Sequence, residues 1–205
     1  MKTLAFELSS GRGSIALVAN GEALFDRSFP NDRKHSGAFF ENVELCLQQL
    51  GAPEEIVVGL GPGSYAGVRI AIATALGLRS AVSARLVGIA SICALDVEDR
   101  DYCVIGDARR QSFYLARVSN GTLVDGPILM TANELEARIT AATMPVYSSE
   151  QLAQFPLAKL AYPAARKLAD LARSEIDDSR PLEPIYLREP HITTPREARP
   201  FAPTK

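Results

Sequence analysis

The first thirty residues alternate apolar and polar side chains with a period of two, which is the pattern of half-buried strands. Three such segments follow one another, at 3–8, 14–19 and 22–29. Asn20 and Gly21 separate the last two, and this dipeptide favours a tight hairpin because its turn needs a positive φ at both positions. The pattern therefore predicts a three-stranded antiparallel meander.

After the meander the apolar residues recur at helical spacing. A helix is predicted through Phe39 and Val43 to Leu50, with Ser36 as its N-cap and with Gly51 after its end. Beyond it, the pattern predicts a strand at 56–60, a helix at 67–84, a strand at 86–89 and a further helix capped by Ser91.

The charged cluster at 96–101 is the predicted boundary between two lobes, because strand patterns begin again directly after it. We expect a first lobe at 1–98, a second and smaller lobe at 99–190, and an extended tail at 191–205. The second lobe is predicted to hold strands at 102–106 and 112–118, a turn at Asn120-Gly121, a helix at 131–140, a strand near Val146 and a helix at 164–174. No repeat is visible residue by residue, so the relation between the lobes is inferred from element order.

Composition excludes several classes of protein. The 22 basic and 24 acidic side chains give a formal net charge of -2, so the chain lacks the charge that wide contact with nucleic-acid phosphates requires. Its three cysteines and two histidines, His35 and His191, have no metal-ligand spacing, so we expect no metal site. No serine has a visible triad, and we expect no catalytic residue. The start of the chain is too polar for a signal peptide and no apolar run spans a membrane, so we expect a cytoplasmic protein.

The segment from Gly61 to Arg69, GPGSYAGVR, is the most informative stretch of the chain. A glycine-rich turn that enters a helix can hold a phosphate, because its backbone N–H groups are accessible. It lacks the Gly-Lys-Ser/Thr ending of a P-loop, so a plain strand-to-helix turn is the alternative reading.

The helix that follows this loop is apolar on every side over its first three turns. A helix of this kind is covered either by the rest of its own chain or by a partner. Its small residues would permit the close approach of another helix; they are Gly67, Ala71, Ala73, Ala75 and Gly77.

The first turn of the meander carries Glu7, Ser9 and Ser10. An acidic residue followed by hydroxyl side chains at a hairpin is used for metal and phosphate in actin-like nucleotide lobes. The alternative reading is a hairpin loop with glycines for its turn, so these residues are only weak nucleotide-loop candidates.

Several segments together resemble one family. LGPGSYAGVRIAIATALGL and KHSGAFFENVELCL are similar to the glycine-rich loop and the first helix of TsaB (YeaZ-type) proteins, GDARRQSFYLARV resembles their second-lobe hairpin, and PIYLRE their C-terminal segment. TsaB is the short, non-catalytic relative of the threonylcarbamoyl transferase TsaD. The resemblance implies an α/β, actin-like (ASKHA, RNase H-like) fold with two lobes, each a mixed sheet with antiparallel opening strands and flanking helices.

The resemblance also implies a function, as an accessory subunit in tRNA threonylcarbamoyladenosine modification. Such a subunit docks on a TsaD-type catalytic subunit, helps to recruit a TsaE-type ATPase, forms a homodimer when alone, and meets tRNA only through the complex. No cofactor is expected in the chain itself, with ATP or ADP at a joint interface left open. The residues predicted for the partner interface are His35, Phe39, Phe40, Val43, Gly61, Gly63, Ser64, Tyr65, Gly67, Val68, Arg69, Ile72, Ala75 and Leu76.

Two departures from the family pattern and two rival functions remain. Glu7 stands where the family more often has Asp, and Tyr65-Ala66 where Phe-Thr is usual, which removes the threonine hydroxyl from the loop. One rival is an autonomous enzyme of the same superfamily, either glycoprotease-like or ATP-binding. The other is an actin-fold scaffold that associates with itself.

Overall fold

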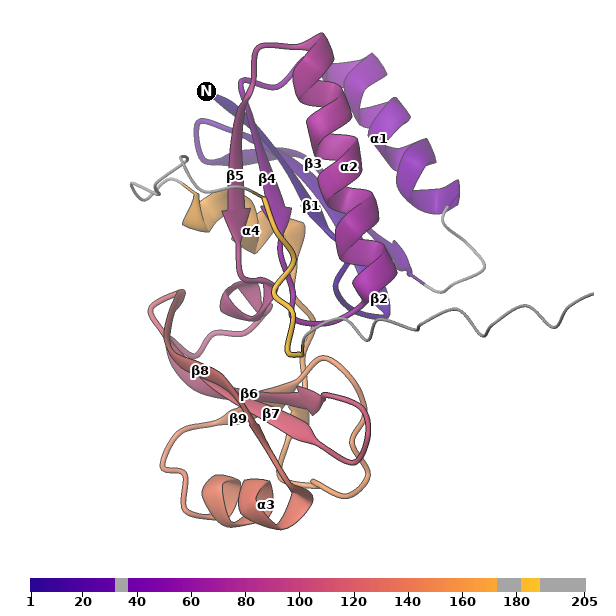
Figure 1. Cartoon of the computed structure of the whole chain (residues 1–205). Helices are drawn as coiled ribbons and strands as arrows, with labels where there is room; N and C mark the ends of the chain where they lie inside the picture. Colours follow the sequence, from indigo (N-terminus) through magenta and orange to yellow (C-terminus); the bar gives the residue numbers. More distant parts are fainter. Residues whose placement is uncertain (32–36, 173–181, 189–205) are drawn as a thin grey trace, which may run out of the picture.

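The computed structural model describes residues 1–31, 37–172 and 182–188, and places them in two lobes, each built on a five-stranded mixed sheet (Figure 1). The first sheet has the order β3-β2-β1-β4-β5, in which β1, β2 and β3 are antiparallel neighbours and β4 and β5 run parallel to β1. Its strands are β1 (Lys2–Glu7), β2 (Arg12–Ala19), β3 (Glu22–Pro30), β4 (Glu55–Gly59) and β5 (Arg85–Ile89). The predicted meander is confirmed, and Asn20 and Gly21 turn it with φ of 51° and 91°.

Two helices, α1 (Gly37–Leu50) and α2 (Tyr65–Ala81), cover one face of the first sheet. Phe39 from α1 packs edge-on against Phe6 from β1, with ring centroids 5.3 Å apart. Val68 and Ala71 from α2 join the same core. Burying this apolar surface holds both helices on the sheet.

The second sheet repeats the order of the first. Its strands lie in the order β8-β7-β6-β9-β10, again with three antiparallel neighbours followed by parallel ones, and α3 follows the third strand as α1 does. The elements are β6 (Asp101–Asp107), β7 (Phe113–Ser119), β8 (Thr122–Met130), α3 (Ala132–Thr140), β9 (Val146–Ser148) and β10 (Lys159–Leu160). The predicted architecture of two lobes, each a mixed sheet with antiparallel opening strands, is confirmed, and the common order supports the inferred relation between the lobes.

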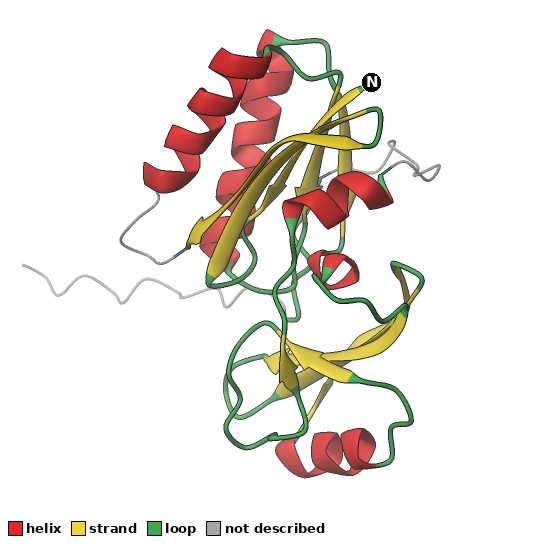
Figure 2. Cartoon of the chain, turned by 180° about the vertical axis from the view of Figure 1, so that it is seen from behind, coloured by secondary structure: helices red, strands yellow, loops and turns green. Residues whose placement is uncertain are grey.

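The last helix, α4 (Ala165–Leu171), returns to the first lobe. It packs against β1, β2 and β4 on the face opposite α1 and α2 (Figure 2). Leu168 is fully buried in a core that also contains Val57 from the first sheet and Val104 from the second. The segment that the sequence assigned to the second lobe therefore completes the first, and one core joins the two.

Several elements differ from the prediction. β8 was not predicted, because it is an exposed edge strand interrupted by Gly126 and Pro127 and shows no alternating burial. β10 was not predicted either, because it is only two residues long. The prediction that Ser91 caps a helix was wrong: residues Ser91–Ala94 form a 3-10 turn, and the Oγ atom of Ser91 accepts a hydrogen bond from the N–H of Gly61 instead.

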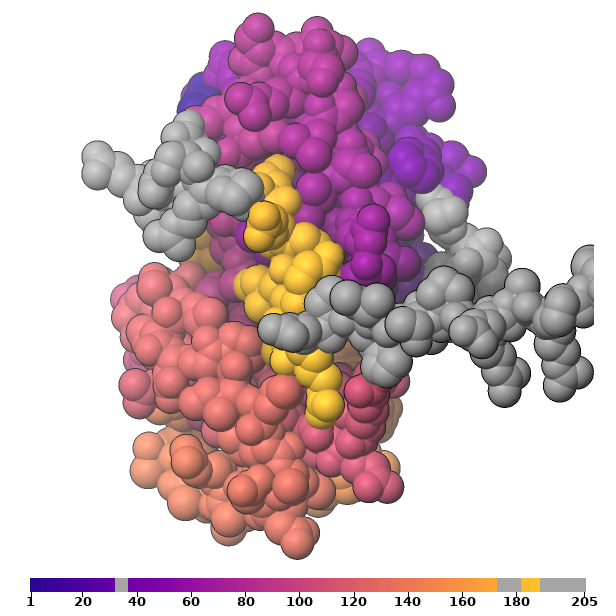
Figure 3. Space-filling view, in the orientation of Figure 1, coloured from indigo at the N-terminus to yellow at the C-terminus, as the bar shows by residue number. Residues whose placement is uncertain are grey.

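The segment 182–188 crosses from the first lobe to the second as an extended strap (Figure 3). At its start Leu182 packs on the core under α1 and α2, and the N–H of Ile185 donates to the carbonyl of Leu60 at 2.8 Å. At its end the guanidinium of Arg188 donates to the carbonyl of Arg109 at 3.5 Å. The strap therefore touches both lobes.

Candidate protein-docking site

The glycine-rich loop is packed tightly against the first turn of the meander. The N–H of Ser64 donates to the carbonyl of Ser9 at 2.6 Å. A Cβ atom at Gly63 would overlap with the same carbonyl, and one at Gly67 would overlap with the carbonyl of Leu8. These positions need glycine because two backbones meet there.

Ser64 begins α2, because its side chain accepts a hydrogen bond from the N–H of Gly67 at 3.2 Å. The helix therefore starts at Tyr65, two residues earlier than the sequence predicted. The N–H of Gly67 donates to the N-cap side chain of Ser64, and the N–H of Ser64 donates to the carbonyl of Ser9. Both N–H groups are therefore bonded within the chain. This arrangement favours the reading of the segment as a structural strand-to-helix turn.

Glu7 is fully buried at the end of β1. Its Oε1 atom accepts the N–H of Ser9 at 2.6 Å, while Oε2 has no hydrogen-bond partner within 3.5 Å. Burial raises the pKa of this carboxyl, and the hydrogen bond from Ser9 opposes the rise only in part. A carboxyl enclosed in this way cannot reach a metal-bound nucleotide from its buried position.

The other two nucleotide-loop candidates are also enclosed. Ser9 and Ser10 are buried, and the Oγ atom of Ser10 bonds to the backbone of Arg12. Neither fits a phosphate loop, whose donors must face the ligand. Within the described residues no three His, Cys, Asp or Glu side chains are grouped to hold a metal ion, and no helix there is long and apolar enough to cross a membrane.

The structure divides the predicted interface residues into buried and exposed sets. Ala75 is 0% exposed and belongs to the core beneath α2, so its predicted place on a docking surface is wrong for this fold. The face of α2 that carries Ala75 is packed against the first sheet. The same correction holds for the other buried members of the set: Phe39, Val43, Gly61, Gly67, Val68 and Ile72.

The exposed members lie on the outer side of the same two helices and in the loop directly before α2. Phe40 on α1 is 50% exposed, Tyr65 and Leu76 on α2 are 55% and 46% exposed, and Gly63, Ser64 and Arg69 are exposed as well. His35 lies outside the described residues. The guanidinium of Arg69 stacks over the ring of Tyr65, 5.1 Å from its centroid, and donates to its hydroxyl. The outer side of α1 and α2 thus carries large apolar side chains in water.

Sequence reasoning missed Leu45 and Ala66 on this outer side. With residues already named, they complete what we call the outer face: Phe40, Leu45, Tyr65, Ala66, Ala73, Leu76 and Gly77. On α2 these positions, with the exposed Arg69 between Ala66 and Ala73, recur every three or four residues, so they form one stripe along the helix. The signal was present in the sequence, but an all-apolar helix does not reveal which stripe the sheet covers.

A polar pocket of about 360 Å³ lies on the other side of the first sheet, near the N-terminus of α4. Arg12, Arg166 and Lys167 line it together with Asp26, Asp96 and Asp170, so its cations and anions are equal in number. No residue of the glycine-rich loop contributes to it. This balance of charge favours no ligand of either sign.

A family model for TsaD, described as tRNA N6-adenosine threonylcarbamoyltransferase, matches residues 30–177 of the chain. The chain belongs to the TsaD family. The match covers α1, α2 and the whole second lobe, together with α4.

Curated relatives of this TsaD-family chain occur in mycobacteria. It is 31% identical over 152 residues to an uncharacterized protein of Mycobacterium leprae, which corresponds to 73% of the chain and 41% of that protein. It is 29% identical over 184 residues to an uncharacterized protein of Mycobacterium tuberculosis, covering 87% of the chain and 84% of the relative. The chain therefore spans less than half of the first relative and most of the second.

Solved structures from Pseudomonas aeruginosa share the fold of this TsaD-family chain. One is described as an uncharacterized protein with similarity to peptidase YeaZ, with a TM-score of 0.72 and 24% identity over 91% of the chain and 99% of that structure. Another is YeaZ itself, with a TM-score of 0.69 and 22% identity over the same shares. The two-lobed arrangement is thus that of YeaZ.

Proposed function

We propose that this chain is a TsaB-type accessory subunit of the tRNA N6-adenosine threonylcarbamoyltransferase complex. It docks on a TsaD-type catalytic subunit, helps to recruit a TsaE-type ATPase, and forms a homodimer through the same surface when alone. Membership of the TsaD family and the YeaZ fold support the first part of this proposal.

The observation that carries the docking proposal is the outer face of α1 and α2. Both helices already bury one side on the first sheet, yet Phe40, Tyr65 and Leu76 remain about half exposed on the other. Exposed apolar side chains gathered on one surface mark an interaction site. The small residues Ala73 and Gly77 allow the backbone of a partner helix to come close to α2.

The enclosed first turn supports a subunit without chemistry of its own. Glu7, Ser9 and Ser10 are buried and bonded within the chain, so they are not arranged to receive a nucleotide. We propose that any ATP or ADP contact arises only at the joint interface with the partner.

The experiment that tests this proposal measures mass. The chain and a TsaD-type homologue from the same source are purified separately, mixed, and measured by light scattering after gel filtration. We expect a one-to-one complex, and a homodimer when the chain is alone. A chain that stays monomeric and ignores the homologue contradicts the proposal, as does ATP turnover that survives repurification of the isolated chain.

A further inference from the structure

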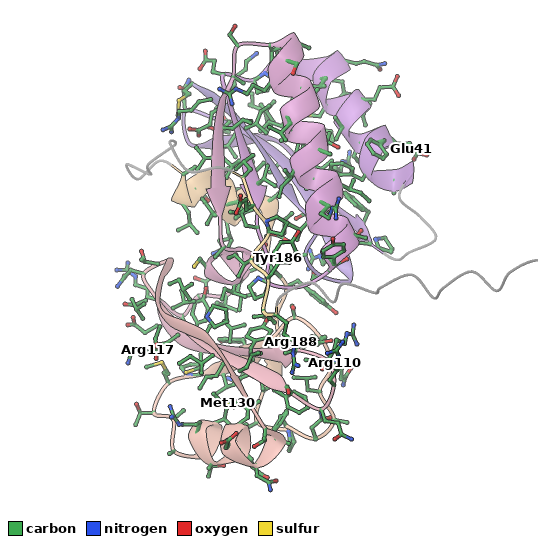
Figure 4. All side chains as sticks on the ribbon, in the orientation of Figure 1. Glu41, Arg110, Arg117, Met130, Tyr186 and Arg188 are labelled. Atoms are coloured by element: carbon green, nitrogen blue, oxygen red, sulfur yellow. The ribbon has the colours of Figure 1, made fainter. Side chains whose placement is uncertain are left out.

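A line of arginine and tyrosine side chains crosses the junction of the two lobes. Tyr186 and Arg188 come from the strap, and Arg109 and Arg110 from the turn between β6 and β7. In Figure 4, Tyr186, Arg188 and Arg110 follow one another from the first lobe down to the second. Together with Tyr65 and Arg69 of α2 we call this line the basic strip.

The strip is continuous because each side chain contacts the next segment. Arg69 stacks on Tyr65, whose ring centroid lies 5.7 Å from that of Tyr186. Arg188 lies two residues after Tyr186 in the strap, and its guanidinium donates to the carbonyl of Arg109. The strip therefore begins at the outer face and ends on the second lobe.

The charges of the strip are only partly compensated. Arg109 pairs with Asp107 at 3.1 Å. Among the described residues, Arg188 has only its bond to a backbone carbonyl, and Arg110 has no hydrogen bond or ion pair. Guanidinium groups that lack a carboxylate partner, as Arg110 and Arg188 do among the described residues, are stabilised by a bound anion.

The turn that presents these arginines has an unusual backbone. Arg109, Arg110 and Gln111 have φ of 64°, 54° and 59°, which puts three successive side-chain-bearing residues in the left-handed region. The N–H of Arg109 donates to Asp107 at 2.7 Å, and the N–H of Asp107 donates to Glu150 at 2.7 Å. These bonds hold an otherwise unfavourable turn in which Arg109 and Arg110 both point into water.

We propose that the basic strip binds the phosphate backbone of an RNA strand that the docked partner holds. Four guanidiniums interleaved with two tyrosines, 55% and 49% exposed, are suited to a nucleic acid because phosphates pair with arginine and bases stack on aromatic rings. The strip starts at the outer face, so an RNA held by a subunit docked there passes directly onto it. The inference rests on the proposed function, which supplies the RNA as a tRNA.

An RNA fits the strip better than the acidic surface of a protein does. A carboxylate partner would explain the arginines but not the exposed tyrosines between them. Four arginines also contact few phosphates, so the isolated chain binds weakly, in agreement with its net charge of -2.

The test uses the complex with the TsaD-type subunit and an unmodified tRNA transcript with an adenosine beside the anticodon. The variant is R110A/R188A, and the matched control is R117A/R138A, which removes two exposed arginines from β7 and α3 away from the strip. We expect the variant complex to bind tRNA about tenfold more weakly, with a salt dependence shallower by about 1 to 2 in log–log slope. The control should bind like the wild type.

Three further measurements separate the outcomes. Complex mass and thermal melts are recorded before the titration, because loss of the complex in R110A/R188A would make the strip a protein contact and overturn the RNA assignment. If that variant is poorly folded, the single variant R110A decides, since the exposed Arg110 side chain has no hydrogen bond or ion pair with a described residue. If the wild type forms no complex, the proposed function fails, and the same titration on the isolated chain at low salt still tests the strip. Equal affinities for variant and control overturn it.

Discussion

The N–H of Ala165, at the start of α4, donates to the buried Oγ atom of Ser14 in β2 at 2.9 Å. The two residues are 151 positions apart in the chain. Ala165 is fully buried, so no water replaces the hydroxyl if it is lost. This bond fixes α4 to the first sheet and supplies the acceptor for a buried N–H group at the start of α4.

We therefore expect Ser14→Ala to destabilise the protein. The variant leaves a buried N–H without an acceptor, which costs about 1–3 kcal/mol. Urea unfolding of Ser14→Ala and of the control Ser80→Ala measures the difference. Ser80 is exposed on α2, and its substitution should change the free energy of unfolding by less than about 0.5 kcal/mol. Equal effects at the two sites would mean that the Ser14 bond adds nothing to stability.

The neighbouring residues Ala75 and Leu76 lie on different sides of α2, Ala75 in the core and Leu76 on the proposed docking surface. Ala75→Arg forces a charge into the core under α2 and should lower the melting temperature severely. Leu76→Arg should leave the melt nearly unchanged and abolish the complex with the TsaD-type subunit, because the charge would be buried only on docking. A Leu76→Arg chain that still forms the complex would remove the outer face of α2 from the interface.

Two glycines of α2 should respond in opposite directions to alanine. At Gly67 the new Cβ overlaps with the carbonyl of Leu8, and overpacking of this kind costs about 1–3 kcal/mol. At Gly77 there is nothing within 4 Å, so alanine should stabilise the isolated chain by about 0.5–1 kcal/mol through helix propensity. Thermal melts of the two variants check both signs. A stabilising Gly67→Ala would show that the loop is not packed as described.

Glu7 should make stability depend on pH. Burial raises its pKa in the folded state, so the folded protein binds a proton more tightly than the unfolded one. Stability is then greatest below the unfolded pKa of about 4.5 and falls as pH rises toward the folded pKa, with a slope of up to about 1.4 kcal/mol per pH unit.

The variant Glu7→Gln should remove this fall, because the amide is neutral at every pH. Urea unfolding of both proteins between pH 5 and 8 should give curves that diverge as pH rises, with the variant the more stable at the upper end. Glu7→Ala is the control, since it removes the charge and leaves a cavity. Parallel pH profiles for wild type and Glu7→Gln would show that the carboxyl does not titrate in this range.

Local signals in the sequence were enough for most strands and helices. Asn20-Gly21 and Asn120-Gly121 both turn with positive φ, as such pairs do in tight hairpins. β8 was missed because an edge strand needs no buried face, so Val124 and Ile128 are exposed and show no alternation.

The candidate site was only partly predictable for a different reason. Apolar residues occupy both sides of α2, so sequence spacing does not show that Ala75 packs on the sheet while Leu76 faces water. Arg110 and Arg188 are far apart in sequence, and only the path of the strap brings them to one surface. Both facts depend on tertiary structure that periodicity does not encode.

Because α4 packs on the first lobe but follows the second sheet in the chain, the first lobe cannot be fully folded until the second has been synthesised. The side of the first sheet that α4 covers includes Ala5, Ala16 and Val57, all fully buried in the finished protein. A ribosome produces these strands early, but residues 165–171 emerge only after the entire second sheet. Until then the early strands keep an uncovered apolar face, which makes the nascent first lobe prone to aggregation.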